Sequence, residues 1–82
     1  MYDVVSVKYL KSYILEVVFE NGEHTEMDLK EYASRGGIFA PLSDPEYFKR
    51  VFVNKDLGTL CWPNGADIAP ETLYRVVKEK AR

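Results

Sequence analysis

The chain has 82 residues, a length that forms one domain, so we expect a single domain over residues 1–82. Its composition, 46% hydrophobic and 29% charged, is that of a folded globular protein and excludes an intrinsically disordered one. The formal charge of −2 argues against strong non-specific nucleic-acid binding, because that affinity comes mainly from neutralising phosphates.

The cysteine content and the apolar runs indicate a cytoplasmic protein. Cys61 is the only cysteine, so the chain cannot form an internal disulfide, which fits a reducing compartment. The first residues lack the basic region and apolar run of a signal peptide. The longest apolar runs have two or three residues and are too short to cross a membrane.

The first third of the chain reads as a meander of three strands. Apolar and polar residues alternate with a period of two over residues 4–9, 13–20 and 24–29. Lys11-Ser12 can turn the chain after the first strand. Asn21-Gly22 predicts a type I′ hairpin turn, because both residues tolerate positive φ. One face of this sheet is apolar, so we expect that face to pack on the core.

The middle of the chain is less regular. Residues 29–34 predict one helical turn, ended by Gly36-Gly37. The glycines and prolines of the next segment interrupt regular structure, and its apolar residues are expected to hold it to the core: Ile38, Phe39 and Leu42.

Asp44-Pro45-Glu46 is a helix-start signal, since Asp caps free N–H groups and Pro suits the first helical position. We expect a short helix over Pro45–Arg50, with Tyr47 and Phe48 facing inward or across to the sheet.

The last third predicts a second hairpin and a closing helix. The hairpin strands are residues 51–54 and 59–62, and the helix runs over residues 70–80. The helix has one apolar face, made by Leu73, Val76 and Val77. The fold class is therefore α+β: an antiparallel sheet of about five strands, a short middle helix, and a C-terminal helix packed on the sheet.

The segment between the second hairpin and the last helix carries the densest local pattern. Trp62 ends a strand with a large apolar ring, Pro63 removes a ladder donor, and Asn64-Gly65 reverses the chain. Asp67 can accept hydrogen bonds from the turn or from the helix start, and Pro70 suits the first helical position. We interpret the segment as a structural corner, with Trp62, Pro63, Asn64, Gly65, Asp67 and Pro70 as its motif. The alternative is a surface where Asn64 and Asp67 bind a ligand or partner.

No set of residues predicts a catalytic, cofactor or metal site. His24 is the single histidine, and one histidine among scattered carboxylates is a weak metal signal. Cys61 has no local base or helix N-terminus to activate its thiol. Gly36-Gly37 lacks the lysine and hydroxyl spacing of a phosphate loop. We therefore predict that the protein is not an enzyme and has no cofactor.

Charge is unevenly placed along the chain. Residues 71–82 carry four cations against two acids, whereas the stretch around the first hairpin is acidic. That stretch is either a solvated surface or an acidic face for a basic partner. As a candidate interaction surface it comprises Glu20, Glu23, Glu26, Asp28 and Glu31.

Nearly the whole chain resembles a bacterial family catalogued as domain of unknown function 2442. The resemblance rests on Leu15–Glu23, Asp28-Leu29, Gly37–Leu42, Asp44–Phe48 and Gly58–Tyr74, which follow in the family's order. The last of these segments is specific. The family often has Asp where this chain has Asn21, and either residue fits the turn.

The resemblance implies a small α+β domain with no established enzymatic activity or catalytic residues. Many members look as if they are encoded beside a second small protein, in the manner of a toxin–antitoxin pair. We therefore hypothesise a protein-interaction module with a small protein partner, antitoxin-like and either monomeric or homodimeric. One alternative is a nucleic-acid-associated regulator that uses the basic C-terminal helix. A small enzyme that uses Cys61, His24 or Asp67 is the least favoured.

Overall fold

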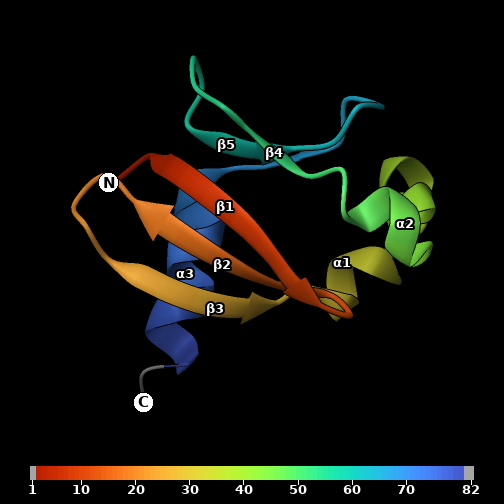
Figure 1. The fold of residues 1–82 in the computed structure, drawn as a ribbon, viewed down its shortest axis with the longest axis horizontal. Helices are drawn as coiled ribbons and strands as arrows, with labels where there is room; N and C mark the ends of the chain where they lie inside the picture. The colour runs from red at the N-terminus through yellow and green to blue at the C-terminus, as the bar shows by residue number, and fades with distance from the viewer. Residues whose placement is uncertain (1, 81–82) are drawn as a thin grey trace.

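A meander of three strands forms the first sheet, as the alternation predicts. The computed structural model describes residues 2–80, with side chains described up to Arg75. The strands are β1 (Val4–Lys11), β2 (Ile14–Phe19) and β3 (His24–Asp28). They pair antiparallel in the order β1-β2-β3 (Figure 1).

The two faces of this first sheet differ in polarity. The inner face is fully buried at Leu15, Val17 and Met27. The outer face carries rows of cross-strand neighbours, such as Lys8, Glu16 and Glu26. The alternation therefore sorted the residues of β2 and β3 correctly between core and surface. In β1 a register shift between Val4 and Ser6 buries Val4 and leaves Val5 exposed.

The prediction of a type I′ turn between β2 and β3 is wrong. Gly22 has a φ of 87°, but Asn21 does not adopt a positive φ. Phe19 N–H donates to Glu23 O at 2.9 Å, so three residues form the loop. The Asn21 side chain accepts from Glu23 N–H at 3.1 Å instead. A three-residue loop ending in a left-handed glycine is the next commonest hairpin connection.

Three short helical segments form the middle of the chain. They are α1 (Lys30–Ala33), the 3₁₀ helix η1 (Gly37–Ser43) and α2 (Pro45–Phe48). The prediction of α1 is confirmed, whereas η1 was expected to be irregular. The helix α2 ends two residues earlier than predicted.

The second hairpin belongs to a separate sheet, which corrects the expected single sheet. Its strands are β4 (Phe52–Asn54) and β5 (Thr59–Cys61), and a third strand, β6 (Asp67–Ile68), pairs with β5. The sequence did not predict β6, because two residues are too few to show an alternation.

The final helix, α3 (Pro70–Lys80), has the predicted bounds. Figure 1 shows α3 behind the first sheet. Leu73 is fully buried, and the Tyr74 ring meets Phe19 edge to face at a centroid distance of 5.2 Å. The predicted apolar positions Val76 and Val77 lie outside the described side chains. The α+β class and the packing of α3 on the sheet are confirmed.

The two sheets share one core although they are not joined by a ladder. Val4 N–H donates to Gly58 O at 2.9 Å, which fixes the start of β1 to the β4–β5 loop. The core contains residues of both sheets and of α2, including Phe19, Phe48 and Leu60. None of the described helices is long and apolar enough to span a bilayer.

Candidate functional site

The Trp62 side chain is buried and joins α2 to β5. Its indole Nε1–H donates to Phe48 O at 3.0 Å, so the polar atom of the buried ring is satisfied. The Phe48 ring lies tilted against it at 5.8 Å. Trp62 N–H donates to Ala66 O at 2.9 Å, which closes the turn that follows.

Asn64 ties this turn to two distant segments. Its backbone N–H donates to the Tyr47 hydroxyl at 2.8 Å, and its Nδ2 donates to Ile38 O at 2.9 Å. Its Oδ1 accepts from Ala66 N–H at 3.1 Å. Three segments that carry the family resemblance therefore meet at one residue, through its backbone N–H and its side-chain amide. The sequence assigned Asn64 only to chain reversal, because contacts over 17 and 26 residues leave no local signal.

Asp67 does not make the expected hydrogen bonds. Its side chain is exposed, and it has no hydrogen-bond partner among the described residues. Asp67 lies in β6, where its backbone pairs with that of Cys61 in β5. The other motif positions lie as their types suggest: Pro63 is exposed after β5, Gly65 has a φ of 92°, and Pro70 begins α3.

The residues considered for chemistry are not brought together. Cys61 is buried in β5, with its Sγ 3.2 Å from the Thr59 hydroxyl. His24 is exposed on β3, in the other sheet. Asp67 is the cross-strand neighbour of Cys61, but its side chain is exposed whereas that of Cys61 is buried. Within the described residues, no group of three or more potential ligands could hold a metal ion.

The surface of the described residues includes two open hollows. One, of about 430 Å³, lies where β1 begins and is lined by Asp3, Val4, Val5, Glu20 and Lys55. The other, of about 340 Å³, is lined by Asp44, Glu46, Tyr47 and Arg50. Neither has the enclosed, mostly apolar lining typical of a small-molecule site.

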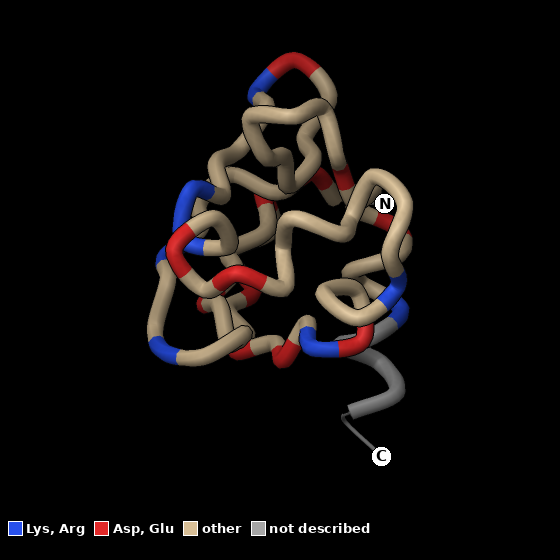
Figure 2. The backbone as a smooth tube through the Cα atoms, turned by 90° about the vertical axis from the view of Figure 1, so that its right-hand side faces the viewer, with Lys and Arg blue, Asp and Glu red and all other residues tan. Residues whose placement is uncertain are grey.

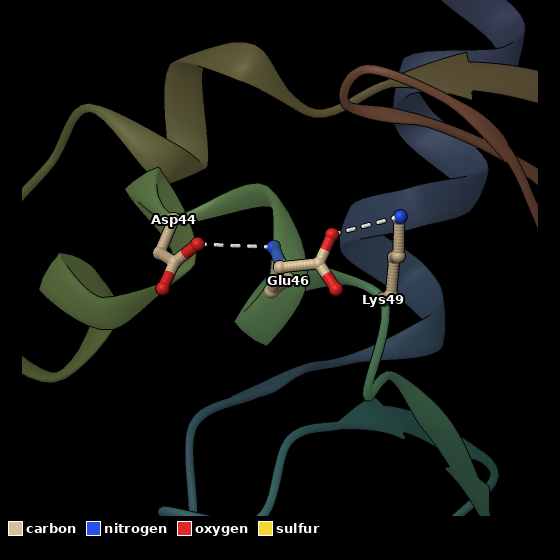
Figure 3. Close-up of polar contacts among 3 residues, drawn as sticks. All are labelled: Asp44, Glu46 and Lys49. Atoms are coloured by element: carbon tan, nitrogen blue, oxygen red, sulfur yellow. Dashed lines mark hydrogen bonds and ion pairs between the residues drawn. The ribbon is translucent and has the colours of Figure 1, made fainter.

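The second hollow is bordered by the capped start of α2 (Figure 3). Asp44 Oδ1 accepts from Glu46 N–H at 3.0 Å, the N-cap that the sequence predicts. The Lys49 ammonium lies 2.9 Å from Glu46 Oε2, and this hydrogen bond raises the pKa of Lys49 above its ordinary value.

The five acidic residues of the candidate surface do not form one patch. Glu26 and Asp28 share the outer face of β3, beyond which Glu31 lies on α1. Glu20 lines the hollow beside Asp3. The Glu23 carboxylate accepts from the Tyr74 hydroxyl at 2.9 Å, which ties it to α3.

Glu16 belongs with the acidic residues of β3, although the sequence did not single it out. It lies directly opposite Glu26 across the β2–β3 pair. In Figure 2 acidic positions recur along the lower margin of the described chain, where Figure 1 places β3 and α1. The sequence signal was available, since Glu16 falls on the polar side of the β2 alternation.

β3 is also the edge of its sheet. The first sheet has the order β1-β2-β3, so the described residues place no strand beside β3 on the side away from β2. The opposite edge, β1, is partly covered, because β4 contacts it and Val4 bonds to Gly58. Figure 1 shows the β4–β5 hairpin over β1, on the far side of the sheet from β3.

The basic C-terminal segment is only partly described. Arg75 is exposed on α3. The other cations of the nucleic-acid hypothesis, Lys78, Lys80 and Arg82, lie outside the described side chains.

The fold defines a small α+β domain with two antiparallel sheets and a closing helix. Residues 4–79 match the family described as protein of unknown function (DUF2442), and the chain belongs to this family. The resemblance seen in the sequence is thereby confirmed. No curated protein and no solved structure matches the chain.

Proposed function

We propose that this protein is a small interaction module that binds a cationic protein partner. The observation that supports the proposal is the edge strand β3, which has acidic side chains along it and no strand beside it among the described residues. An exposed edge is a template for pairing with another chain, and proteins use it for recognition. The acidic flank would select a partner of opposite charge.

The finer proposal is that the module acts as the antitoxin-like member of a toxin–antitoxin-type gene pair. A toxin directed at nucleic acid would carry a basic surface, because it must contact phosphates. An acidic β3 region would cover that surface by charge complementarity. The support for this step is the chemistry of the surface together with the gene arrangement that family membership suggests.

The test is co-expression of this chain with the product of the neighbouring gene, followed by purification through a tag on one chain. We expect a stable complex whose affinity falls with added salt, since exposed charges are screened. A double variant, Glu16→Lys with Glu26→Lys, should weaken the complex by about tenfold or more.

Asp56→Lys is the control for charge reversal away from β3, because it replaces one acid by lysine in the exposed β4–β5 loop and so makes the same charge change as either single substitution of the double variant. It should leave the complex unchanged. A chain that purifies alone and monomeric with its neighbour present would contradict the proposed function.

A further inference from the structure

The hydrogen-bond register of β3 decides which of its backbone groups face away from the sheet. Phe19 N–H donates to Glu23 O, and Leu29 N–H donates to Tyr13 O at 2.8 Å. Residues of an antiparallel pair alternate between hydrogen-bonded and non-hydrogen-bonded positions. Thr25 and Met27 therefore direct their backbone groups at β2, and the intervening positions direct theirs outward.

The outward positions are also the charged ones. His24, Glu26 and Asp28 have their side chains on the outer face, since Met27 between them is buried on the inner face. A strand added beside β3 would form its hydrogen bonds at these same positions. Its side chains directly opposite would face two carboxylates and one imidazole, with Glu16 one strand further in.

This arrangement disfavours a second copy of the chain as the added strand. An antiparallel pair of β3 strands centred on its middle residue would set Glu26 directly opposite Glu26 of the other copy. Like charges directly opposite each other destabilise a sheet. Cations at alternate positions of a foreign strand would instead form opposite-charge pairs across the new ladder.

We propose that β3 accepts, as a fourth strand of the first sheet, a partner segment with Lys or Arg at alternate positions and apolar residues between them. The apolar residues would extend the inner face beside Thr25 and Met27. This inference rests on the proposed function and specifies the mode of binding, strand addition at one edge.

The experiment uses the isotopically labelled full chain and a synthetic peptide of alternating lysine and valine. We expect the amides of His24 and Asp28 to shift and to gain protection from hydrogen exchange when the peptide binds. A peptide of alternating glutamate and valine should bind about tenfold more weakly or not at all, because opposite-charge pairs become like-charge pairs. N-methylation of the lysine–valine backbone at alternate positions should abolish binding in one of the two possible frames.

Two variants separate the roles of backbone and charge. His24→Pro removes an outward N–H at the first residue of β3, a position where a strand tolerates proline. It should weaken binding severalfold without changing the melting temperature by more than a few degrees. If that variant does not fold, Glu16→Lys with Glu26→Lys tests the same surface by charge alone.

The results that would overturn the inference are specific. Equal binding of both peptides would mean that the β3 charges do not select the partner. Shifts confined to other elements would mean that these charges only keep the edge from pairing. A homodimer with the His24 and Asp28 amides protected would identify a second copy as the occupant. A native complex that leaves these amides unchanged would remove this inference and retain the proposed function. Peptide pairing at β3 without a complex between the two gene products would contradict the proposed function and retain this inference.

Discussion

Asn64 is the residue on which the corner after β5 depends. It bonds to Ile38 and Tyr47 from one position, and it also closes its own turn at Ala66. Asp67, three residues later, has the same capacity to accept hydrogen bonds, but its side chain points to solvent. The two polar residues of this motif therefore contribute differently to the stability of the fold.

The first prediction compares these two residues. Asn64→Ala removes a donor and an acceptor, so it should lower the free energy of unfolding by about 1–2 kcal/mol. Asp67→Ala should change it by less than about 0.5 kcal/mol, as is usual for exposed positions. Urea denaturation followed by Trp62 fluorescence measures both values. Equal losses in the two variants would contradict the assignment of Asn64.

Gly58 is the second residue with a steric role. Its φ is 67°, it is buried, and an added Cβ would overlap the side chain of Asp3. Gly22 has a similar φ of 87°, but it has open space where a Cβ would stand.

The second prediction uses Gly22 as the control for Gly58. Gly22→Ala should cost about 1 kcal/mol, the cost of a left-handed alanine. Gly58→Ala should cost about 2 kcal/mol or more, because the overlap with Asp3 adds to that strain. Thermal melts of the two variants give the comparison. A smaller loss for Gly58→Ala than for Gly22→Ala would contradict the close approach of β1 to this loop.

At the scale of elements, short helices with little hydrogen bonding of their own depend on their caps. α2 has only four residues, and the Asp44 carboxylate satisfies one of its free N–H groups (Figure 3). Phe48 then directs its ring into the core beneath Trp62. The cap therefore positions a core residue as well as starting the helix.

The third prediction concerns this cap. Asp44→Ala should lower the free energy of unfolding by about 1 kcal/mol, and Asp44→Asn by only a few tenths, since Asn also caps well. Chemical denaturation checks both variants. An Asn variant as unstable as the Ala variant would show that the charge of Asp44, and not its acceptor oxygen, stabilises α2.

At the scale of the whole molecule, two sheets that are not joined by a ladder share a single core. Trp62 and Leu60 from the second sheet lie in the same buried cluster as Phe19 and Leu15 from the first. The strands of the second sheet have only two or three residues, so this sheet needs packing against other elements to be stable. The second sheet therefore depends on the core that it shares with the first.

The fourth prediction is that the domain unfolds in one step, with a free energy on the order of 5 kcal/mol. Trp62 fluorescence reports on the second sheet, and far-ultraviolet circular dichroism reports on the whole backbone. Their urea transitions should coincide. Separate midpoints would show that the second sheet unfolds independently of the first.

The sequence by itself determined the family and the elements other than η1 and β6. Alternation with a period of two predicted the first strands, and the helix-start signal Asp44-Pro45 predicted α2. The turn residues after Trp62 separated the second hairpin from α3. All these signals are local in the sequence. The acidic stretch near β3 was also visible, although its division among separate surfaces was not.

Only the tertiary structure decided which residues and strands contact segments that are remote in the sequence. It separated the second hairpin into its own sheet with β6, since strand pairing between remote segments depends on packing rather than propensity. It gave Asn64 contacts with partners 17 and 26 residues away, whereas Asp67 does not accept the local hydrogen bonds that were predicted for it. It made β3 an edge and set Glu16 beside Glu26, and that register is the physical basis of the proposed strand addition.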